Sequence, residues 1–409
     1  MATRGCPRVV AVSTRIRTGA ALLGPAFVAA IAYVDPGNVA TNTAAGARYG
    51  YLLVWVLVVA NVIAGLVQYL SAKLGLVTRQ SLPEAVRDHL PRPVRLAYWG
   101  QAEVVAMATD LAEVLGGAIA LALLFDLPLL LGGVITGVVS TVLLLVQDKR
   151  GQKPFERVIT TMLVVIAVGF MAGLFVSPPS VSGAASGLVP RFDGADSVLL
   201  AAGMLGATVM PHAVYLHSAL ARDRHGRNPS VLGATKVDVV VAMVLAGAVN
   251  MAMLLLAASA LQGTSGVDTL EGAHAAVSAQ LGGGIALLFA LGLLASGFAS
   301  TAVGCYAGAV VMDGLLRVRI PLLARRLITL VPALAILAVG VDPTFALVLS
   351  QVVLSFGIPF ALVPLVWLTA RRSVMGSFAN RRSVTLAASA VAFAVVVLNV
   401  ALIYLTMSA

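Results

Sequence analysis

Long stretches without a charged side chain are the feature that most constrains the fold of this chain. A helix that crosses a membrane needs about 20 mostly apolar residues, and ten stretches free of Asp, Glu, Lys and Arg approach or exceed that length. They are residues 19–34, 49–72, 127–147, 158–190, 197–221, 239–267, 275–312, 327–341, 343–370 and 383–409. An eleventh stretch, residues 96–125, is equally apolar but contains Glu103, Asp110 and Glu113. We therefore predict an all-α polytopic membrane protein with eleven transmembrane helices.

The composition excludes several other classes of protein. Hydrophobic residues make up 60% of the 409 residues and charged residues 11%, whereas a typical soluble chain has about 25% charged residues. Soluble enzymes, disordered regulators and secreted disulfide scaffolds are therefore excluded. The apolar stretches are continuous and not alternating, which excludes a membrane barrel of strands. The two cysteines, Cys6 and Cys305, are too few for a disulfide framework or a cysteine-rich metal site.

The basic residues predict how the chain lies in the cell membrane. If the N-terminus is cytoplasmic, 25 of the 27 Lys and Arg residues fall on the cytoplasmic side, and only Arg48 and Arg191 fall outside. Because cytoplasmic loops are enriched in Lys and Arg, we predict a multi-pass plasma-membrane protein with a cytoplasmic N-terminus and, after eleven helices, an extracellular C-terminus. The net charge of +10 therefore indicates topology and not a nucleic-acid partner.

The acidic residues divide differently between the two sides. Seven are expected on the cytoplasmic side, among them Glu156 and Asp238, and six outside, where only two basic residues lie. A net acidic outer face favours the approach of cations. The remaining four acidic residues lie inside predicted helices: Asp35, Glu103, Asp110 and Glu113.

Two of the predicted helices are interrupted at matching positions. The motif Asp-Pro-Gly-Asn at residues 35–38 breaks the first helix, and Met-Pro-His at residues 210–212 breaks the sixth. Such paired interruptions are the sequence sign of a transporter built from inverted repeats, with its binding site at the breaks. We therefore predict a cytoplasmic N-terminal segment (1–18), a first five-helix repeat (19–176), an extracellular loop (177–195), a second five-helix repeat (196–370), and a cytoplasmic loop with the eleventh helix (371–409).

The breaks bring together an inventory of ligands for a cation. A proline lacks the N–H that would bond the carbonyl four residues earlier, so Pro211 frees the carbonyl of Ala207 and Pro36 frees that of Ala32. Beside these carbonyls lie the Asp35 carboxylate, the Asn38 amide oxygen and the Met210 thioether. Since Mg²⁺ and Ca²⁺ take oxygen ligands whereas sulfur favours transition metals, this set predicts Mn²⁺ or Fe²⁺.

The three acids of the third helix suggest a proton relay. Glu103, Asp110 and Glu113 fall within one stripe roughly 100° wide and spread over about 15 Å along the helix, which is too long for one metal cluster. They could pass protons, or form structural ion pairs, for instance with Arg325 or Arg326, and both roles could hold together.

The histidines of the sixth helix cannot chelate one ion. His212 and His217 are five residues apart, about 140° around a regular helix. His212 could be a metal ligand or a proton acceptor, and we favour proton handling because Met210 already faces the break.

These residues resemble a known family, the Nramp divalent-metal transporters, which are proton-coupled carriers of manganese and iron with the leucine-transporter fold. The resemblance rests on residues 35–42 (DPGNVATN) and 206–212 (GATVMPH) with 215–218, and on residues 109–113, 325–327 and 350–351. It extends over essentially the whole chain. Position 213 is Ala where the family often has Asn, but that side chain is not a ligand in the family pattern.

The resemblance implies a role for each site residue. The implied metal ligands are Asp35, Asn38, Met210 and the Ala207 carbonyl, with the Ala32 carbonyl and Gln351 as further ligands in other conformations. The implied proton route comprises His212, Asp110, Glu113, Arg325 and Arg326, with Glu103 and His217 as accessories. Family members that carry magnesium or aluminium lack the methionine, so Met210 argues against those cargoes.

The sequence as a whole predicts a secondary transporter that imports Mn²⁺, with Fe²⁺ and other divalent ions as further cargoes, coupled to protons by alternating access. A passive cation channel and an amino-acid carrier of the same fold are the alternatives, although Asp35 would repel an amino acid's carboxylate. An enzyme is not expected, because nucleotide-binding, zinc-protease and nucleophile motifs are absent. We expect no resident cofactor, metal ions and protons as substrates, the lipid bilayer as surroundings, and a monomer.

Overall fold

The computed structural model describes residues 24–226 and 229–408 of the chain. The predicted segment 1–18 and the beginning of the first apolar stretch lie outside the described residues. The main helices are α2 (Pro25–Ile31), α3 (Pro36–Tyr49), α4 (Val54–Thr78), α6 (Arg92–Phe125), α7 (Leu129–Arg150), α8 (Gln152–Met171), α9 (Gly173–Val176), α11 (Gly194–Thr208), α12 (Pro211–His225), α13 (Leu232–Ala260), α15 (Gly283–Leu316), α16 (Leu322–Val339), α17 (Pro343–Ala370) and α19 (Arg382–Ser408). Short helices connect them: α5 (Leu82–Arg87), α10 (Val181–Ser186), η1 (Pro229–Val231), α14 (Leu270–Leu281), α18 (Arg372–Met375) and η2 (Gly376–Phe378).

The predicted number of membrane crossings agrees with this architecture. Ten helical segments of the described chain are long and apolar enough to cross a membrane. The pair α2 and α3 supplies the eleventh crossing, because each half is too short by itself. Within the described residues the regular structure is entirely helical. The all-α polytopic fold predicted from the sequence is therefore confirmed.

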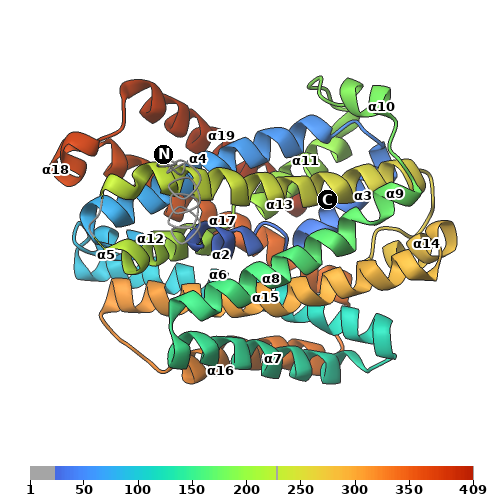
Figure 1. Ribbon diagram of the computed structural model, residues 1–409, viewed down its shortest axis with the longest axis horizontal. Helices are drawn as coiled ribbons and strands as arrows, with labels where there is room; N and C mark the ends of the chain where they lie inside the picture. Colours follow the sequence, from blue (N-terminus) through green and yellow to red (C-terminus); the bar gives the residue numbers. More distant parts are fainter. Residues whose placement is uncertain (1–23, 227–228, 409) are drawn as a thin grey trace, which may run out of the picture.

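The long helices run roughly parallel to one another, and their connections gather at two ends (Figure 1). The short helices α5 and α18 lie at one end, and α10 and α14 lie at the other. The half-helices α2 and α12 point towards the end that carries α5, whereas α3 and α11 point towards the end that carries α10. Each broken helix therefore changes direction or unwinds in the middle of the bundle.

The two longest helices, α6 and α15, form the centre of the bundle and pack closely against each other. A methyl group at Gly297 of α15 would come within 2.7 Å of the Gly117 Cα on α6, so the backbones touch at this crossing. The outer helices instead expose large apolar side chains, such as Val138 and Val142 of α7 and Val244 of α13. Such an apolar exterior suits lipid, because it has no polar groups to satisfy.

Several charged residues that the sequence analysis assigned to cytoplasmic segments are buried. Arg325 and Arg326 are fully buried inside α16, which begins at Leu322 and not at residue 327. Glu156 in α8 and Asp238 in α13 are also buried. Glu156 lies near the beginning of α8 and Asp238 near the beginning of α13, so both acids are packed within the bundle. The physical reason is that hydrogen bonds and ion pairs compensate these charges, so a helix can continue past them.

The predicted apolar stretch at residues 158–190 is longer than the helix that forms from it. The helical segment ends at Val176, and residues 181–186 form α10 in the connection to α11. Pro178 and Pro179 lie in this connection, and proline cannot continue a helix because it lacks the N–H.

Candidate functional site

The first break lies between α2 and α3, where residues 32–35 leave the helical path. Asp35 caps the N-terminus of α3, and its Oδ1 accepts a hydrogen bond of 2.9 Å from the Asn38 backbone N–H. The carbonyls of Tyr33 and Val34 are also bonded: the first accepts from Asn250 Nδ2 at 2.7 Å and the second from Ser296 Oγ at 2.6 Å. The unwound backbone is therefore held by side chains of α13 and α15.

The second break is shorter and lies between α11 and α12. α11 ends at Thr208 and α12 begins at Pro211, so only Val209 and Met210 stand between them. Met210 has extended backbone angles and is fully buried, but its side chain does not cap the helix. Pro211 has no N–H to offer the Ala207 carbonyl, as the sequence predicts.

The two breaks meet at the side chain of Asn38. Its Nδ2 donates to Asp35 Oδ1 at 2.5 Å and to the Ala207 carbonyl at 2.9 Å, and so joins the two broken helices. The second oxygen of Asp35, Oδ2, is buried without a hydrogen-bond partner among the described residues. The structure therefore brings three of the predicted ligand residues, Asp35, Asn38 and Ala207, into direct contact.

Gln351 joins this group from α17. A methyl group placed on Gly37 would collide with the Gln351 amide and would lie 3.2 Å from Asp35 Oδ2. Both polar atoms of the Gln351 side chain are buried and lack a hydrogen-bond partner in the described part of the chain. Gln351 is thus placed where the resemblance implies a ligand. The thioether of Met210 and the carbonyl of Ala32 remain predicted ligands, although both residues are fully buried beside the breaks.

The donor set at the breaks is poor in charge. Among the described residues, no group of three or more His, Cys, Asp or Glu side chains is arranged to hold a metal ion. Of the predicted ligand residues, Asp35 is the one with a carboxylate, whereas the others offer amide, carbonyl or thioether groups.

Two of the three acids of α6 form ion pairs with α16. Glu103 pairs with Arg325, and Arg326 Nη1 lies 2.5 Å from Asp110 Oδ1. Both arginines are fully buried, and Glu103 and Asp110 are nearly so. The ion pairs considered in the sequence analysis are therefore present, and each pair neutralises two charges inside the bundle.

Glu113, the third acid of α6, differs from the other two. It is fully buried, and neither carboxyl oxygen has a hydrogen-bond partner among the described residues. Its charged neighbours are Asp110, Asp35 and Arg326. One turn further along α6, Gly116 leaves the space that the Pro36 ring fills. Glu113 therefore lies near the first break and near the Asp110–Arg326 pair.

His212 lines a small cavity. The cavity is lined by His212, Gln101, Glu103 and Arg325, and about 10 Å³ of it can hold the centre of a water molecule. This is close to the smallest space that one buried water needs. Both ring nitrogens of His212 are buried without a hydrogen-bond partner in the described chain. The structure thus places His212, Glu103 and Arg325 around one polar space.

His217 lies in a separate network. Its Nδ1 is 2.7 Å from Gln68 Oε1, and Gln68 Nε2 donates to the Tyr33 hydroxyl at 2.6 Å. All three side chains are fully buried. His217 is not among the residues that line the cavity of His212.

Sequence reasoning missed several polar residues that hold the breaks. Asn250 and Ser296 bond the unwound carbonyls, and Asn42 Nδ2 donates to Asn250 Oδ1 at 2.9 Å. Gln68 joins His217 to Tyr33. The available signal was a lone polar side chain inside an apolar stretch, because such groups usually bond across helices in a membrane.

The missed acid Asp238 holds the beginning of α2, and the second missed acid, Glu156, lies close to Gly24. Asp238 accepts hydrogen bonds of 3.0 Å from the backbone N–H groups of Gly24 and Ala26. Glu156 accepts from Gln152 at 2.6 Å and lies 3.6 Å from Arg224 of α12. A carboxylate at a helix N-terminus satisfies free N–H groups and the helix dipole, so these contacts fix the half-helix α2 to α13.

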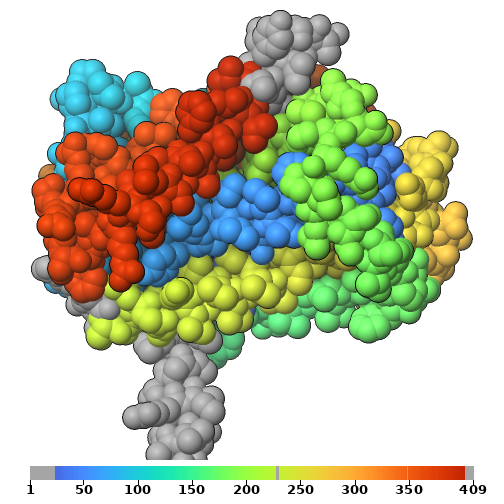
Figure 2. Space-filling model, turned by 90° about the horizontal axis from the view of Figure 1, so that it is seen from above, coloured from blue at the N-terminus to red at the C-terminus, as the bar shows by residue number. Residues whose placement is uncertain are grey.

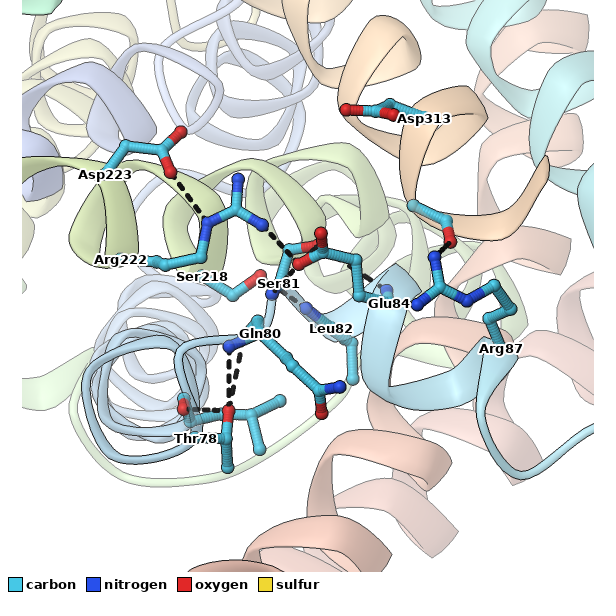
Figure 3. Close-up of polar contacts among 12 residues, drawn as sticks. Thr78, Gln80, Ser81, Leu82, Glu84, Arg87, Ser218, Arg222, Asp223 and Asp313 are labelled. Atoms are coloured by element: carbon cyan, nitrogen blue, oxygen red, sulfur yellow. Dashed lines mark hydrogen bonds and ion pairs between the residues drawn. The ribbon is translucent and has the colours of Figure 1, made fainter. Parts of the chain in front are cut away.

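A further polar network closes the same end of the molecule around α5 (Figure 3). Ser81 and Glu84 form a capping box, in which each side chain bonds the other's backbone N–H. Glu84 also pairs with Arg222 of α12, and Arg87 donates to the Gly314 carbonyl of α15 at 2.9 Å. The Leu82 N–H donates to the Ser218 hydroxyl at 2.8 Å. α5 therefore joins α12 to α15 where α12 approaches its C-terminal end.

A helical membrane bundle in which two broken helices meet at a buried carboxylate defines a membrane transporter of the leucine-transporter fold class. Comparison with solved structures supports this assignment. The chain superposes on a manganese transporter of Eremococcus coleocola with a TM-score of 0.86 and 30% identity, covering 97% of this chain and 87% of the other. At 17% identity and a TM-score of 0.58 it also superposes on Mhp1, a nucleobase-cation-symport-1 family transporter, covering 86% and 79%, which indicates the fold alone.

Comparison of sequences gives the family. Residues 26–405 match the Nramp family, described as natural resistance-associated macrophage protein-like. A divalent metal cation transporter MntH of Mycobacterium tuberculosis is 62% identical over 401 residues, 97% of this chain and 94% of the relative. One of Klebsiella pneumoniae is 49% identical over 383 residues, 93% and 92% of the two chains. The chain belongs to the Nramp family, as the sequence motifs suggested, and the family is one of transporters and not of enzymes.

Proposed function

We propose that this protein imports divalent transition-metal ions, Mn²⁺ above all and Fe²⁺ as a second cargo, across the plasma membrane. The observation that carries the proposal is the contact between the two breaks, in which the Asn38 amide joins Asp35 Oδ1 and the Ala207 carbonyl. Relatives at 49% and 62% identity are named divalent metal cation transporters, and the structural neighbour is a manganese transporter. Both names agree with the cargo expected from Asp35, Asn38 and Met210.

Metal binding replaces contacts that the protein makes with itself. The Asn38 amide group now donates to two oxygens, Asp35 Oδ1 and the Ala207 carbonyl, that a cation would attract. Rotation of the amide about its last bond exchanges its nitrogen and oxygen, so the same side chain can donate to these oxygens or join them as a ligand. The Asp35 carboxylate supplies the negative charge, and the Met210 thioether favours transition metals over Ca²⁺ and Mg²⁺.

Proton coupling rests in this proposal on the groups beside the site. Glu113 is fully buried, and its charged neighbours include both Asp35 and the Asp110–Arg326 pair. A divalent cation at Asp35 repels a proton held nearby, so binding of the metal releases a proton towards α6 and α16. The cavity beside His212 extends the polar path to Glu103 and Arg325.

Alternating access follows from the half-helices. α2 and α12 lie towards one end of the bundle and α3 and α11 towards the other, so each pair can open or close one side of the site (Figure 1). The basic connections support an orientation with the α5 end in the cytoplasm, the N-terminus inside and the C-terminus outside. The protein is taken as a monomer in the membrane.

Uptake of Mn²⁺ into proteoliposomes tests the cargo and the coupling. Wild-type uptake should rise when the outside is made more acidic than the lumen, because inward proton movement then drives import. Asp35→Ala should reduce uptake to the background of protein-free vesicles. Asp193→Ala, which removes an exposed carboxylate before α11, is the matched control and should keep wild-type uptake. Unchanged uptake by Asp35→Ala would exclude the site.

Two further measurements separate the alternatives. Preloading the vesicles with unlabelled Mn²⁺ should accelerate entry of labelled Mn²⁺ by exchange, whereas a passive channel would show no such acceleration. Met210→Ala should retain Mn²⁺ uptake but allow Ca²⁺ or Mg²⁺ to compete. If the variant still discriminates as the wild type does, the thioether does not set the selectivity.

A further inference from the structure

An apolar groove runs along the outside of the bundle between α17 and α19, which are packed side by side. Its volume is about 620 Å³, within the range of about 300–1,000 Å³ typical of small-molecule sites. The apolar side chains that line it are those of Val363, Val366, Trp367, Ala392, Phe393 and Val396. In Figure 2, α19 is the red ridge along this side of the molecule. The groove therefore faces the lipid and not the transport path.

Four arginines stand at one end of the groove, in the connection between α17 and α19. They are Arg371, Arg372, Arg381 and Arg382, and all four are exposed. Arg371 lines the groove itself, and the other three line an adjoining hollow of about 680 Å³. Ala370 and Thr385 line both spaces, so the hollow continues the groove towards the end of the helices.

The positive charge of this cluster is not compensated by the protein. Residues 343–409 contain no Asp or Glu. In the described part of the chain, none of the four arginines forms an ion pair with a carboxylate. Elsewhere at the same end, Arg222 pairs with Glu84 and Arg319 with Asp313. The cluster is therefore free to bind an anion.

The connection that carries the arginines is held in place. Asn380 bonds Thr369 of α17 twice, through its backbone N–H at 3.0 Å and through Nδ2 at 2.9 Å. Its Oδ1 accepts from Lys73 Nζ of α4 at 2.8 Å. The Arg371 guanidinium lies 3.7 Å from the centre of the Trp367 ring, a cation–π contact. The arginines thus stand on a fixed loop beside the groove.

We propose that this surface binds an anionic phospholipid, with the phosphate among the four arginines and an acyl chain along the groove. Tryptophan concentrates at the level of the lipid headgroups, which places Trp367 and its neighbour Arg371 at that level. Basic clusters at this level attract anionic headgroups. A zwitterionic lipid offers the same acyl chain but brings its own cation, so it gains less from four uncompensated arginines. The site is separate from the metal path and does not depend on the cargo.

Quenching of Trp367 fluorescence by brominated lipid tests the site directly. The chain has three tryptophans, so Trp55→Phe/Trp99→Phe leaves Trp367 as the single reporter. The full-length protein is reconstituted in phosphatidylcholine vesicles with a low mole fraction of brominated phosphatidylglycerol or, in parallel, of brominated phosphatidylcholine. We expect apparent binding of the anionic lipid at Trp367 to be at least about fivefold stronger, the factor that one arginine gains at an anionic surface.

Three variants in this background separate a site from a general effect of charge. Arg371→Gln/Arg382→Gln should abolish the preference for the anionic lipid. Lys149→Gln/Arg150→Gln removes the same charge from exposed residues at the end of α7 and should keep the preference for the anionic lipid. Ser389→Phe, which fills the groove without changing any charge, should weaken this preference.

Three results would overturn the proposal. The first is equal quenching of Trp367 by the two brominated lipids in the single-tryptophan protein. The second is a preference that survives Arg371→Gln/Arg382→Gln. The third is a loss of the preference in Lys149→Gln/Arg150→Gln as large as the loss in Arg371→Gln/Arg382→Gln, which would assign the preference to the overall surface potential. Gel filtration confirms that each variant is folded before it is compared.

Discussion

The broken first helix and the broken sixth helix differ in what holds their unwound backbone. At the first break, Asn250 of α13 and Ser296 of α15 bond two consecutive carbonyls. At the second break, the Ala207 carbonyl is bonded by Asn38, which belongs to the first break, and Met210 makes no side-chain cap. The first break is therefore fixed by the surrounding helices, whereas the second is fixed partly through the first.

This difference separates two kinds of residue at one site. Side chains that anchor the first break should affect the stability of the folded protein. Side chains at the junction of the two breaks should affect transport, because the junction is where the cargo must displace protein contacts. Substitutions of the anchoring side chains and of the junction side chains therefore test this distinction between stability and transport.

Asn38→Ala should have the largest effect, because it removes the side chain whose amide nitrogen joins the two breaks. Two buried oxygens, Asp35 Oδ1 and the Ala207 carbonyl, lose their shared donor, and the metal loses a ligand. Since each such interaction is worth about 1–3 kcal/mol, we expect Mn²⁺ uptake at subsaturating metal to fall by about 10- to 100-fold. Initial rates in proteoliposomes measure this loss.

Asn399→Ala is the matched control for that variant. Asn399 is also a buried asparagine, and its Nδ2 donates at 2.6 Å to the Ser355 carbonyl of α17, which belongs to neither break. It should lose some thermal stability but retain uptake. Comparable losses of uptake in both variants would mean that Asn38 acts only through folding.

Asn250→Ala should destabilise the protein more than any substitution at the second break. Asn250 Nδ2 donates to the Tyr33 carbonyl at 2.7 Å, and Asn250 Oδ1 accepts from Asn42 Nδ2 at 2.9 Å. The change removes both hydrogen bonds and leaves the Tyr33 carbonyl and the Asn42 amide buried without these partners. An unsatisfied buried group costs about 1–3 kcal/mol, so the thermal unfolding midpoint in detergent should fall clearly. Ser296→Ala removes one bond and should lower the midpoint by less. A larger fall for Ser296→Ala would contradict the anchoring scheme.

Met210→Leu should have the smallest effect on stability. The swap conserves volume in the core, which costs less than about 1.5 kcal/mol, and the Met210 side chain does not cap α12. The unfolding midpoint should therefore stay near that of the wild type, whereas Ca²⁺ should compete better with Mn²⁺ for uptake. A large drop in the midpoint would show that the second break is held by Met210 and not by Asn38.

The sequence predicts the breaks but not their anchors. Pro36 and Pro211 fix where the helices must be interrupted, because a missing N–H has the same consequence in any helix. Asn250 and Ser296 could not be assigned to the first break, because every unwound carbonyl is an equivalent acceptor and only the packing of α13 and α15 selects Tyr33 and Val34.

The charged residues were harder to place than the prolines. A rule based on charge-free stretches assigns Arg325 and Arg326 to a loop, whereas α16 buries both beside Glu103 and Asp110. The rule fails because it treats each charge alone. In a packed bundle, a pair of opposite charges on neighbouring helices is tolerated where a single charge is not.

The close contact of α6 with its neighbours limits how this protein can vary. Any side chain at Gly116 would collide with the Pro36 ring, and one at Gly297 would collide with the backbone of α6. The exposed valines of the outer helices, such as Val138 and Val142, leave room for side chains of other sizes. Related chains that diverge freely on their outer surface should therefore keep glycine at these two points, because an added methyl group at Gly116 would displace Pro36 and one at Gly297 would force α15 away from α6.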